Sequence, residues 1–243
     1  MEIAEEIVDC EQWNKKFKVV KFGFDIHQDS ELINNFKIEG EALARRLNGT
    51  LARDSSRTRD FDTLKANAIA GVISEFVWRH YLRDFIDKEG LSLSIKEAPL
   101  TDLRNQIDII VVYPDRSSKT IEVRSSFPYT GIKNGICRVF DMLGWYANEV
   151  KTMEVRKDYY VRCLFPYKTS DFLNILGNKF DAYLTGGATR AMLETSEYAR
   201  DKEFIPYDEM VQENIKMTKY RVIEPIINAQ DTRAICGSVI NGL

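Results

Sequence analysis

Residues 106–124, QIDIIVVYPDRSSKTIEVR, decide the fold that this sequence predicts. Apolar side chains recur with a period of two along residues 106–113 and again along residues 119–124, which is typical of β-strands. The residues between these runs begin with Pro-Asp and are rich in turn-forming types. The stretch therefore predicts a β-hairpin. Because both faces of its strands are largely apolar, we expect the hairpin in the interior of a sheet and not at its edge.

Three charged side chains interrupt this apolar hairpin. Asp108 is the lone charge on its face of the first strand, and Glu122 and Arg124 share one face of the second. If the turn pairs Tyr113 with Lys119, all three charges lie on one face, with Asp108 opposite Arg124 and diagonal to Glu122. One interpretation is an ordinary cross-strand ion pair. The other is a functional cluster, which the expected burial favours because a buried strand should not carry an unpaired Asp.

A long helix is predicted at residues 63–88, ahead of the hairpin. Its apolar residues recur at helical spacing, and Glu89-Gly90 supplies a stop. Near Glu75 the apolar residues surround almost the whole helix, so this carboxylate is hard to keep in water and needs a partner. The partner is either Arg79, four residues further on, or a site shared with the hairpin.

The chain divides into three predicted regions. We expect an N-terminal helical region with a basic loop at residues 1–62, a core at residues 63–168, and a mostly helical region at residues 169–243. Within the core, a second helix at 134–153 and a further strand at 159–166 follow the hairpin. This order predicts an α/β fold, a mixed β-sheet flanked by helices, with a helical C-terminal extension.

The flanking regions carry more local predictions. A helix is expected at residues 30–48 and a polar loop at residues 50–62. Near the C-terminus, a helical tract is expected from about residue 208 to residue 227. The Thr-Gly-Gly break at 185–187 is either a turn between helices or a set of backbone N–H groups for a phosphate.

The composition limits the classes of function. The 243 residues are 44% hydrophobic and 29% charged, as in an ordinary globular protein. No apolar stretch is long enough to span a bilayer and the N-terminus is acidic, so we expect no membrane partner and a cytoplasmic location. The four cysteines lie far apart without a CxxC pair and are expected to be reduced and buried. With only two histidines, any metal should be a hard cation held by oxygen, and zinc is not expected.

Basic residues are concentrated locally, although the formal net charge is −3. Residues 119–168 contain nine basic and five acidic side chains, and a second basic cluster precedes the long helix. Patches of this kind either form an ordinary solvated surface or contact nucleic-acid phosphates. Under the second interpretation, the candidates for DNA contacts are Arg53, Arg57, Arg59, Ser125, Ser126 and Lys133.

The order of these features resembles the core of the PD-(D/E)xK nuclease superfamily, which includes many type II restriction endonucleases. A helix carrying Glu75 is followed by a strand with Asp108, by Glu122-x-Arg124 on the next strand, and then by a helix and another strand. The likeness covers residues 63–166. It implies endonucleolytic hydrolysis of double-stranded DNA that depends on Mg²⁺, with Mn²⁺ able to substitute.

The same resemblance assigns roles to individual residues. Asp108 and Glu122 would be metal ligands, the backbone carbonyl of Val123 a further one, and Glu75 a direct or outer ligand. Arg124 would stand in the place of the family lysine. Arginine cannot serve as a base at any relevant pH, so it would position water or stabilise charge on the phosphate. Otherwise the site is inactive and the protein only binds DNA.

Alternatives accompany the resemblance. The literal Pro114-Asp115 falls in the expected turn, so Asp115 is not assigned to the site. A stand-alone chain with large additions to the core resembles a type II restriction enzyme, which implies a homodimer that cuts specific sequences. The alternatives are a repair, recombination or junction-resolving nuclease of the same fold, and a DNA-binding module without catalysis.

Overall fold

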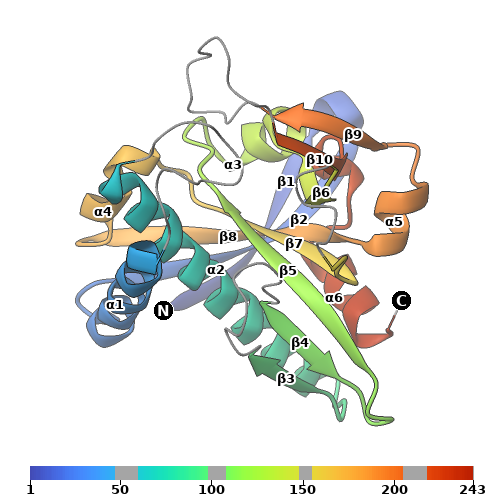
Figure 1. Cartoon of the computed structure of the whole chain (residues 1–243), viewed down its shortest axis with the longest axis horizontal. Coiled ribbons are helices and arrows are strands. Elements are labelled where there is room, and N and C mark those ends of the chain that lie inside the picture. The colour runs from blue at the N-terminus through green and yellow to red at the C-terminus, as the bar shows by residue number, and fades with distance from the viewer. Residues whose placement is uncertain (47–59, 98–107, 148–154, 205–217, 243) are drawn as a thin grey trace.

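The computed structural model describes residues 1–46, 60–97, 108–147, 155–204 and 218–242, which form two β-sheets with helices packed around them (Figure 1). The strands are β1 (Glu2–Cys10), β2 (Lys15–Asp25), β3 (Ser94–Glu97), β4 (Ile109–Val112), β5 (Ser118–Ser126), β6 (Met142–Tyr146), β7 (Tyr159–Leu164), β8 (Lys179–Thr189), β9 (Ala199–Phe204) and β10 (Thr218–Ile223). The helices are α1 (Ser30–Arg46), α2 (Phe61–Lys88), α3 (Ile132–Asn134), α4 (Thr169–Ile175), α5 (Arg190–Thr195) and α6 (Thr232–Ile240), with short helical turns η1 (Glu11–Trp13), η3 (Gly135–Val139) and η5 (Ile226–Asn228). The predicted α/β class is confirmed.

The larger sheet has seven strands in the order β1-β2-β8-β7-β5-β4-β3. Neighbouring strands are antiparallel except β5 and β7, which run parallel, so the sheet is mixed as predicted. The antiparallel neighbours β4 and β5 need only a short turn, whereas a parallel pair needs a crossover connection. That connection contains α3, η3 and β6.

The two faces of the larger sheet carry different cores. Along β7, Tyr159, Val161 and Cys163 pack into the main hydrophobic core together with α2, whereas Tyr160 and Leu164 pack into a second core. This division follows from the pleat of the strand, because successive side chains point to opposite faces. We call the first the α2 face and the second the small-sheet face.

The small-sheet face is covered by the three-stranded sheet β6-β10-β9. Met142 and Trp145 of β6 and Ile223 of β10 belong to the second core, together with Tyr160 and Leu164 of the larger sheet. Figure 1 shows this small sheet and α1 at opposite ends of the molecule. The helix expected on this side of the sheet is therefore replaced by strands.

The predicted helix at 134–153 is wrong. In the described part of this segment, short helical turns end at Val139 and strand β6 follows, and β6 pairs with β10 far along the chain. Gly144 permits the close approach, because a Cβ at this position would lie 2.9 Å from the Arg221 carbonyl oxygen and 2.7 Å from Cδ1 of Leu193. The apolar spacing fits a helix, but pairing with a distant strand overrides it.

The flanking regions contain more strand than predicted. Residues 1–25 form the β1-β2 hairpin before α1, and the region after residue 168 contains β8, β9 and β10 in addition to α4, α5 and the C-terminal helix α6. The helical tract expected at 208–227 is wrong where the structure describes it, because it includes strand β10. The glycine pair at 186–187 lies within β8, and its N–H groups bond to Thr232 and to Gln230, so it forms neither a helix turn nor a phosphate loop.

Helix α2 begins at a capped N-terminus and confirms the long helix predicted from the sequence. The Asp60 side chain accepts a hydrogen bond from the Thr63 backbone N–H (2.6 Å), which satisfies one of the donors left free at a helix start. The expected helix at 30–48 is likewise present as α1. Among the described helices, none is both long and apolar enough to cross a membrane.

The hairpin is confirmed as β4 and β5, with a different register. Val112 pairs with Ser118, so the ladder is shifted by two residues from the expected pairing of Tyr113 with Lys119. A shift of two leaves every side chain on its predicted face. If the ladder continued by one pair, Asp108 would lie opposite Glu122. Arg124 would then lie diagonal to Asp108 and not directly opposite it, as we had expected.

Candidate active site

Asp108 directly precedes β4, just beyond the last residue pair of the β4-β5 ladder. The residue is 8% exposed, and its Oδ2 accepts a hydrogen bond from the backbone N–H of Val123 (2.6 Å). Burial raises the pKa of Asp108 well above its ordinary value, and the charges of Glu122 and Glu75 raise it further. The Val123 N–H and the charge of Arg124 act in the opposite direction. Asp108 therefore lies where buried negative charge accumulates.

Glu122 and Arg124 form an ion pair, with Oε1 and Nη2 3.1 Å apart. Their side chains are only 15% and 16% exposed, so the pair is less screened than one at the surface. Both project to the small-sheet face, because Ile121 between Thr120 and Glu122 packs into the core on the α2 face. The ion pair of Arg124 is thus made with its neighbour on β5, whereas the sequence suggested Asp108.

Two tyrosines from the small sheet hold the Arg124 guanidinium. Its Cζ lies 5.3 Å from the ring centroid of Tyr146 and 5.2 Å from that of Tyr220, and the two ring centroids are 4.4 Å apart. Arg124 Nη2 also donates to the Gly144 carbonyl oxygen at 3.4 Å. Aromatic faces attract a cation, more strongly where water is excluded. These tyrosines were not identified from the sequence, because β6 and β10 were both expected to be helical.

Glu75 approaches the cluster from the other side of the sheet. It belongs to α2, on the face opposite Glu122 and Arg124. Its charge nevertheless raises the pKa of Asp108, which lies at the end of the ladder where groups from both faces are within electrostatic reach. The carboxylates of Glu75 and Glu122 therefore both act on Asp108. The ion pair between Glu75 and Arg79 that the sequence also allows stays a prediction.

The oxygen atoms of this site are the type of ligand that a hard cation prefers. Carboxylate and carbonyl oxygens are the ligands that Mg²⁺ prefers, and a cation would relieve the repulsion that raises the pKa of Asp108. Within the described ranges, however, no three His, Cys, Asp or Glu side chains are grouped closely enough to hold a metal ion. We therefore expect metal binding to require Glu122 to exchange its contact with Arg124 for the metal.

More charged residues lie on the same face and were missed by sequence reasoning. Arg162, 3% exposed, is the direct partner of Arg124 in the parallel β5-β7 register. It donates to the carbonyl oxygen of Asp141 and to Oγ of Ser126 (2.6 Å). The buried Asp141 carboxylate pairs with Lys202 at 2.7 Å. A signal for Arg162 was present, since it is the one charged residue within the strand YYVRCL.

The residues proposed to contact DNA are only partly placed. Ser125 and Ser126 end β5, where the Ser126 hydroxyl donates to the Ser125 carbonyl oxygen (2.6 Å). Lys133 is exposed on α3, with Nζ 3.3 Å from the Glu11 carboxylate. The remaining candidates lie outside the described residues; they are Arg53, Arg57 and Arg59. All of these DNA contacts stay predictions.

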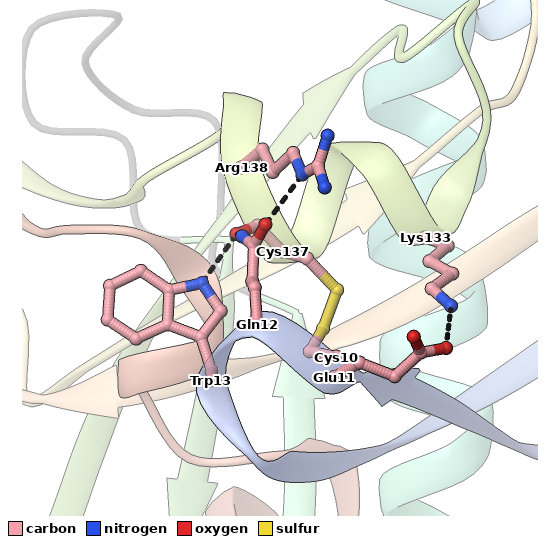
Figure 2. Close-up of a disulfide and its surroundings, with 7 residues drawn as sticks. All are labelled: Cys10, Glu11, Gln12, Trp13, Lys133, Cys137 and Arg138. Atoms are coloured by element: carbon pink, nitrogen blue, oxygen red, sulfur yellow. Dashed lines mark hydrogen bonds and ion pairs between the residues drawn. A yellow bond between two sulfur atoms is a disulfide. The ribbon is translucent and has the colours of Figure 1, made fainter.

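A disulfide joins Cys10 at the end of β1 to Cys137 in η3, with Cα atoms 5.6 Å apart (Figure 2). The prediction that all four cysteines are reduced is therefore wrong for this pair, whereas Cys163 and Cys236 are free and buried as expected. Sequence spacing did not reveal the pair, because 127 positions separate the two residues and the fold alone brings them together.

Polar contacts reinforce the same junction. Figure 2 shows Trp13 and Gln12 directed at the segment that carries Cys137. Both side chains donate to the Cys137 carbonyl oxygen, at 2.8 Å and 2.6 Å, and Arg138 donates to Gln12 at 2.7 Å. The junction therefore anchors η3, which follows β5 along the chain, to the β1-β2 hairpin.

Comparisons with known proteins give little further information. No protein-family model matches the chain, and no solved structure matches it. The chain is similar to MJECS01, an uncharacterized protein of Methanocaldococcus jannaschii, with 25% identity over 253 aligned positions that cover 90% of this chain and 84% of that protein.

Proposed function

We propose that this chain is a Mg²⁺-dependent endonuclease that hydrolyses DNA phosphodiester bonds, most like a sequence-specific type II restriction enzyme. The observation that carries the proposal is the charge around Asp108, a buried aspartate whose pKa is raised by burial and by Glu122 and Glu75. A buried carboxyl group beside two further carboxylates costs folding free energy when it ionises, and carboxyl groups with raised pKa values are frequent in functional sites. A hard cation is the chemical partner that would satisfy it.

The order of the elements also supports the proposal. Helix α2 carries Glu75, Asp108 directly precedes β4, and Glu122 and Arg124 lie on β5, which is followed in the sheet by β7. This is the order on which the resemblance to the PD-(D/E)xK superfamily is based. The helix of that pattern between the last two strands is here reduced to α3 and η3.

Each residue would have a distinct role. Bound Mg²⁺ would supply charge neutralisation at the scissile phosphate and a more acidic water. Asp108, Glu122 and the carbonyl group of Val123 would hold it, with Glu75 as a direct or outer ligand. Arg124, held between Tyr146 and Tyr220, would stabilise negative charge on the phosphate, because a guanidinium stays protonated and cannot accept the proton of water.

The proposed partner is double-stranded DNA, cut by a homodimer in the cytoplasm. The disulfide is unusual for this location, because most cytosolic proteins keep their thiols reduced. Sedimentation of the protein with and without a DNA duplex would test the dimer.

Cleavage of plasmid and phage DNA in the presence of Mg²⁺ tests the proposal. Wild type should give discrete bands. Asp108→Ala and Glu122→Ala should each abolish cleavage while the protein stays folded, because each removes a carboxylate that would bind the metal. Asp115→Ala is a matched control: this aspartate belongs to the literal Pro-Asp pair, but it lies in the exposed turn and bonds to Ser117. Cleavage by either site variant at more than a few per cent of the wild-type rate would reject the site.

The choice of metal gives an independent test. Mg²⁺ and Mn²⁺ should support cleavage, whereas Ca²⁺ should support DNA binding with little cleavage, because all three accept oxygen ligands but differ in the geometry they demand. Stoichiometric zinc in protein purified without added metal would contradict the oxygen-donor site.

One observation favours a second candidate, a DNA-binding module without catalysis. Glu122 is already paired with Arg124, and the described residues contain no ready-made metal cluster. Retained DNA binding without cleavage under any of these metals would support this candidate. A protein that cleaves a branched DNA junction but leaves linear duplex DNA uncut would instead be a junction-resolving nuclease.

A further inference from the structure

Two arginines lie side by side on the small-sheet face. Arg124 of β5 and Arg162 of β7 are direct partners in the parallel register. Burial lowers the pKa of Arg162 to about 10; Asp141 opposes this shift and the charge of Arg124 adds to it. Like charges at paired strand positions repel each other, so the arrangement costs free energy unless something compensates it.

The charges around the pair are compensated unequally. Arg124 is paired with Glu122, and Lys202 is paired with Asp141 and with Glu224. Arg162 has only neutral hydrogen-bond partners within the described residues, the Asp141 carbonyl oxygen and the Ser126 hydroxyl.

The Nε atom of Arg162 is also unsatisfied. It is buried and has no hydrogen-bond partner in the described part of the chain. A buried cation whose direct partners are all neutral is unusual, because buried charges are normally paired. Within the described ranges, Arg162 is therefore the cation of this group whose charge is least compensated, since the nearby Asp141 carboxylate is itself paired with Lys202.

The geometry of the pair selects among anions. Guanidinium groups present planar forks of N–H donors that match a phosphate better than a point charge does. Phe140 lies 4.8 Å from the Arg162 guanidinium, as Tyr146 and Tyr220 lie against that of Arg124, so both forks are held by aromatic rings. Such preorganisation lowers the entropy lost on binding.

We propose that Arg124 and Arg162 together form a phosphate-binding site for the DNA backbone. Arg162 would donate hydrogen bonds to one phosphate, and Arg124 would exchange its contact with Glu122 for the same phosphate. This inference depends on the proposed nuclease function, because it takes the DNA backbone as the ligand. It extends the cationic part of the site from one residue to two and to a second strand.

The experiment measures phosphate binding without cleavage. In EDTA, the thermal midpoint of the full chain is compared in inorganic phosphate and in chloride at equal ionic strength, and a fluorescent DNA duplex is titrated by anisotropy. The variants are Arg162→Met, Arg162→Lys and Arg124→Met. Arg233→Met, at an exposed position of α6, removes the same charge elsewhere and is the matched control.

Phosphate should raise the midpoint of wild type and of Arg233→Met. In Arg162→Met and Arg124→Met the affinity for phosphate and for the duplex should fall roughly tenfold or more, as expected for loss of a charged hydrogen bond. Arg162→Lys should lie between these, because it keeps the charge and loses the fork. Loss of duplex affinity without any effect of inorganic phosphate would restrict the site to a phosphodiester in DNA.

Two results would overturn the inference: equal affinities of wild type and Arg162→Lys, or an unchanged affinity in Arg124→Met. The second remains decisive if Arg162→Met does not fold. Because no step requires cleavage, a protein that binds phosphate through both arginines but never cuts DNA would refute the nuclease proposal alone. A protein that cuts DNA but ignores the Arg162 substitutions would refute this inference alone.

Discussion

Asp108 is the residue at which burial and charge conflict most strongly. Its position before β4 removes it from water, and Glu122 and Glu75 add negative charge around it. The hydrogen bond from Val123 compensates only part of this cost. A carboxyl group in such surroundings favours its protonated form, so the stability of the protein should report directly on whether a cation binds there.

Asp108→Asn should melt at a higher temperature than wild type at neutral pH and without metal. The folded pKa of Asp108 is raised, so its contribution to stability is complete below the unfolded value of about 3.9 and is lost as pH rises through the folded pKa. Asn keeps a hydrogen-bond acceptor for Val123 and never ionises. The gap should be several degrees, at about 2–4 °C per kcal/mol for a chain of this size, and should close as pH falls toward 4.

Mg²⁺ should reverse this order at neutral pH. It should raise the melting temperature of wild type and leave that of Asp108→Asn unchanged, because only the aspartate can ionise and bind the metal. Calorimetric scans of both proteins with Mg²⁺ and with EDTA measure the difference. An equal metal effect on the two proteins would show that Asp108 is not a ligand.

Arg124 separates the active from the inactive interpretation. If it stabilises charge on the phosphate, Arg124→Lys should keep part of the cleavage rate, and Arg124→Ala should lose on the order of 10²-fold or more. If its role is only to bind Glu122 and the two tyrosines, both variants should mainly lower the melting temperature. Single-turnover cleavage rates measured beside thermal melting distinguish these cases: an early-melting Arg124→Ala protein that cuts normally would refute the catalytic role.

Among the elements, those defined by local pattern were predictable and those defined by distant pairing were not. Helix α2 and the hairpin of β4 and β5 have strong periods of their own, and both are present. Strand β6 exists because β10 pairs with it, and a window of sequence around 134–153 contains no sign of that partner. The same limit hid the disulfide between β1 and η3.

Removing that disulfide should lower the stability of the whole protein. The bridge closes a loop between positions separated by 127 residues, and loss of a native disulfide costs about 2–5 kcal/mol. Cys10→Ser with Cys137→Ser should therefore unfold at lower denaturant, although the hydrogen bonds of Gln12 and Trp13 to residue 137 can remain. Equilibrium denaturation with and without reductant gives the measurement.

Reductant supplies the control for this experiment. It should lower the stability of wild type to that of the double variant and should not affect the variant. Wild type denatured without reductant should show two reactive thiols, from Cys163 and Cys236. Four reactive thiols would contradict the disulfide.

For the molecule as a whole, the site is assembled from both sides of one sheet. The sequence predicted Glu122 and Arg124 correctly as charges on one face of a buried strand, because the strand pattern alone determines the face. It could not predict Arg162 beside Arg124, since that contact depends on the parallel pairing of β5 with β7. The tyrosines that hold Arg124 depend in turn on the small sheet docking over it.

The two sheets should unfold together, because the second core is built from both. Ile223 of β10 is fully buried there with Tyr160 and Leu164 of β7. Ile223→Ala should cost about 2–5 kcal/mol and lower the single midpoint on the order of 5–15 °C, whereas Ile7→Ala, at a position 63% exposed on β1, should change it little. Calorimetry decides, since a cooperative unit gives equal calorimetric and van't Hoff enthalpies. Two separate transitions, with only one sensitive to Ile223→Ala, would mean that the small sheet folds independently and does not hold Arg124 in place.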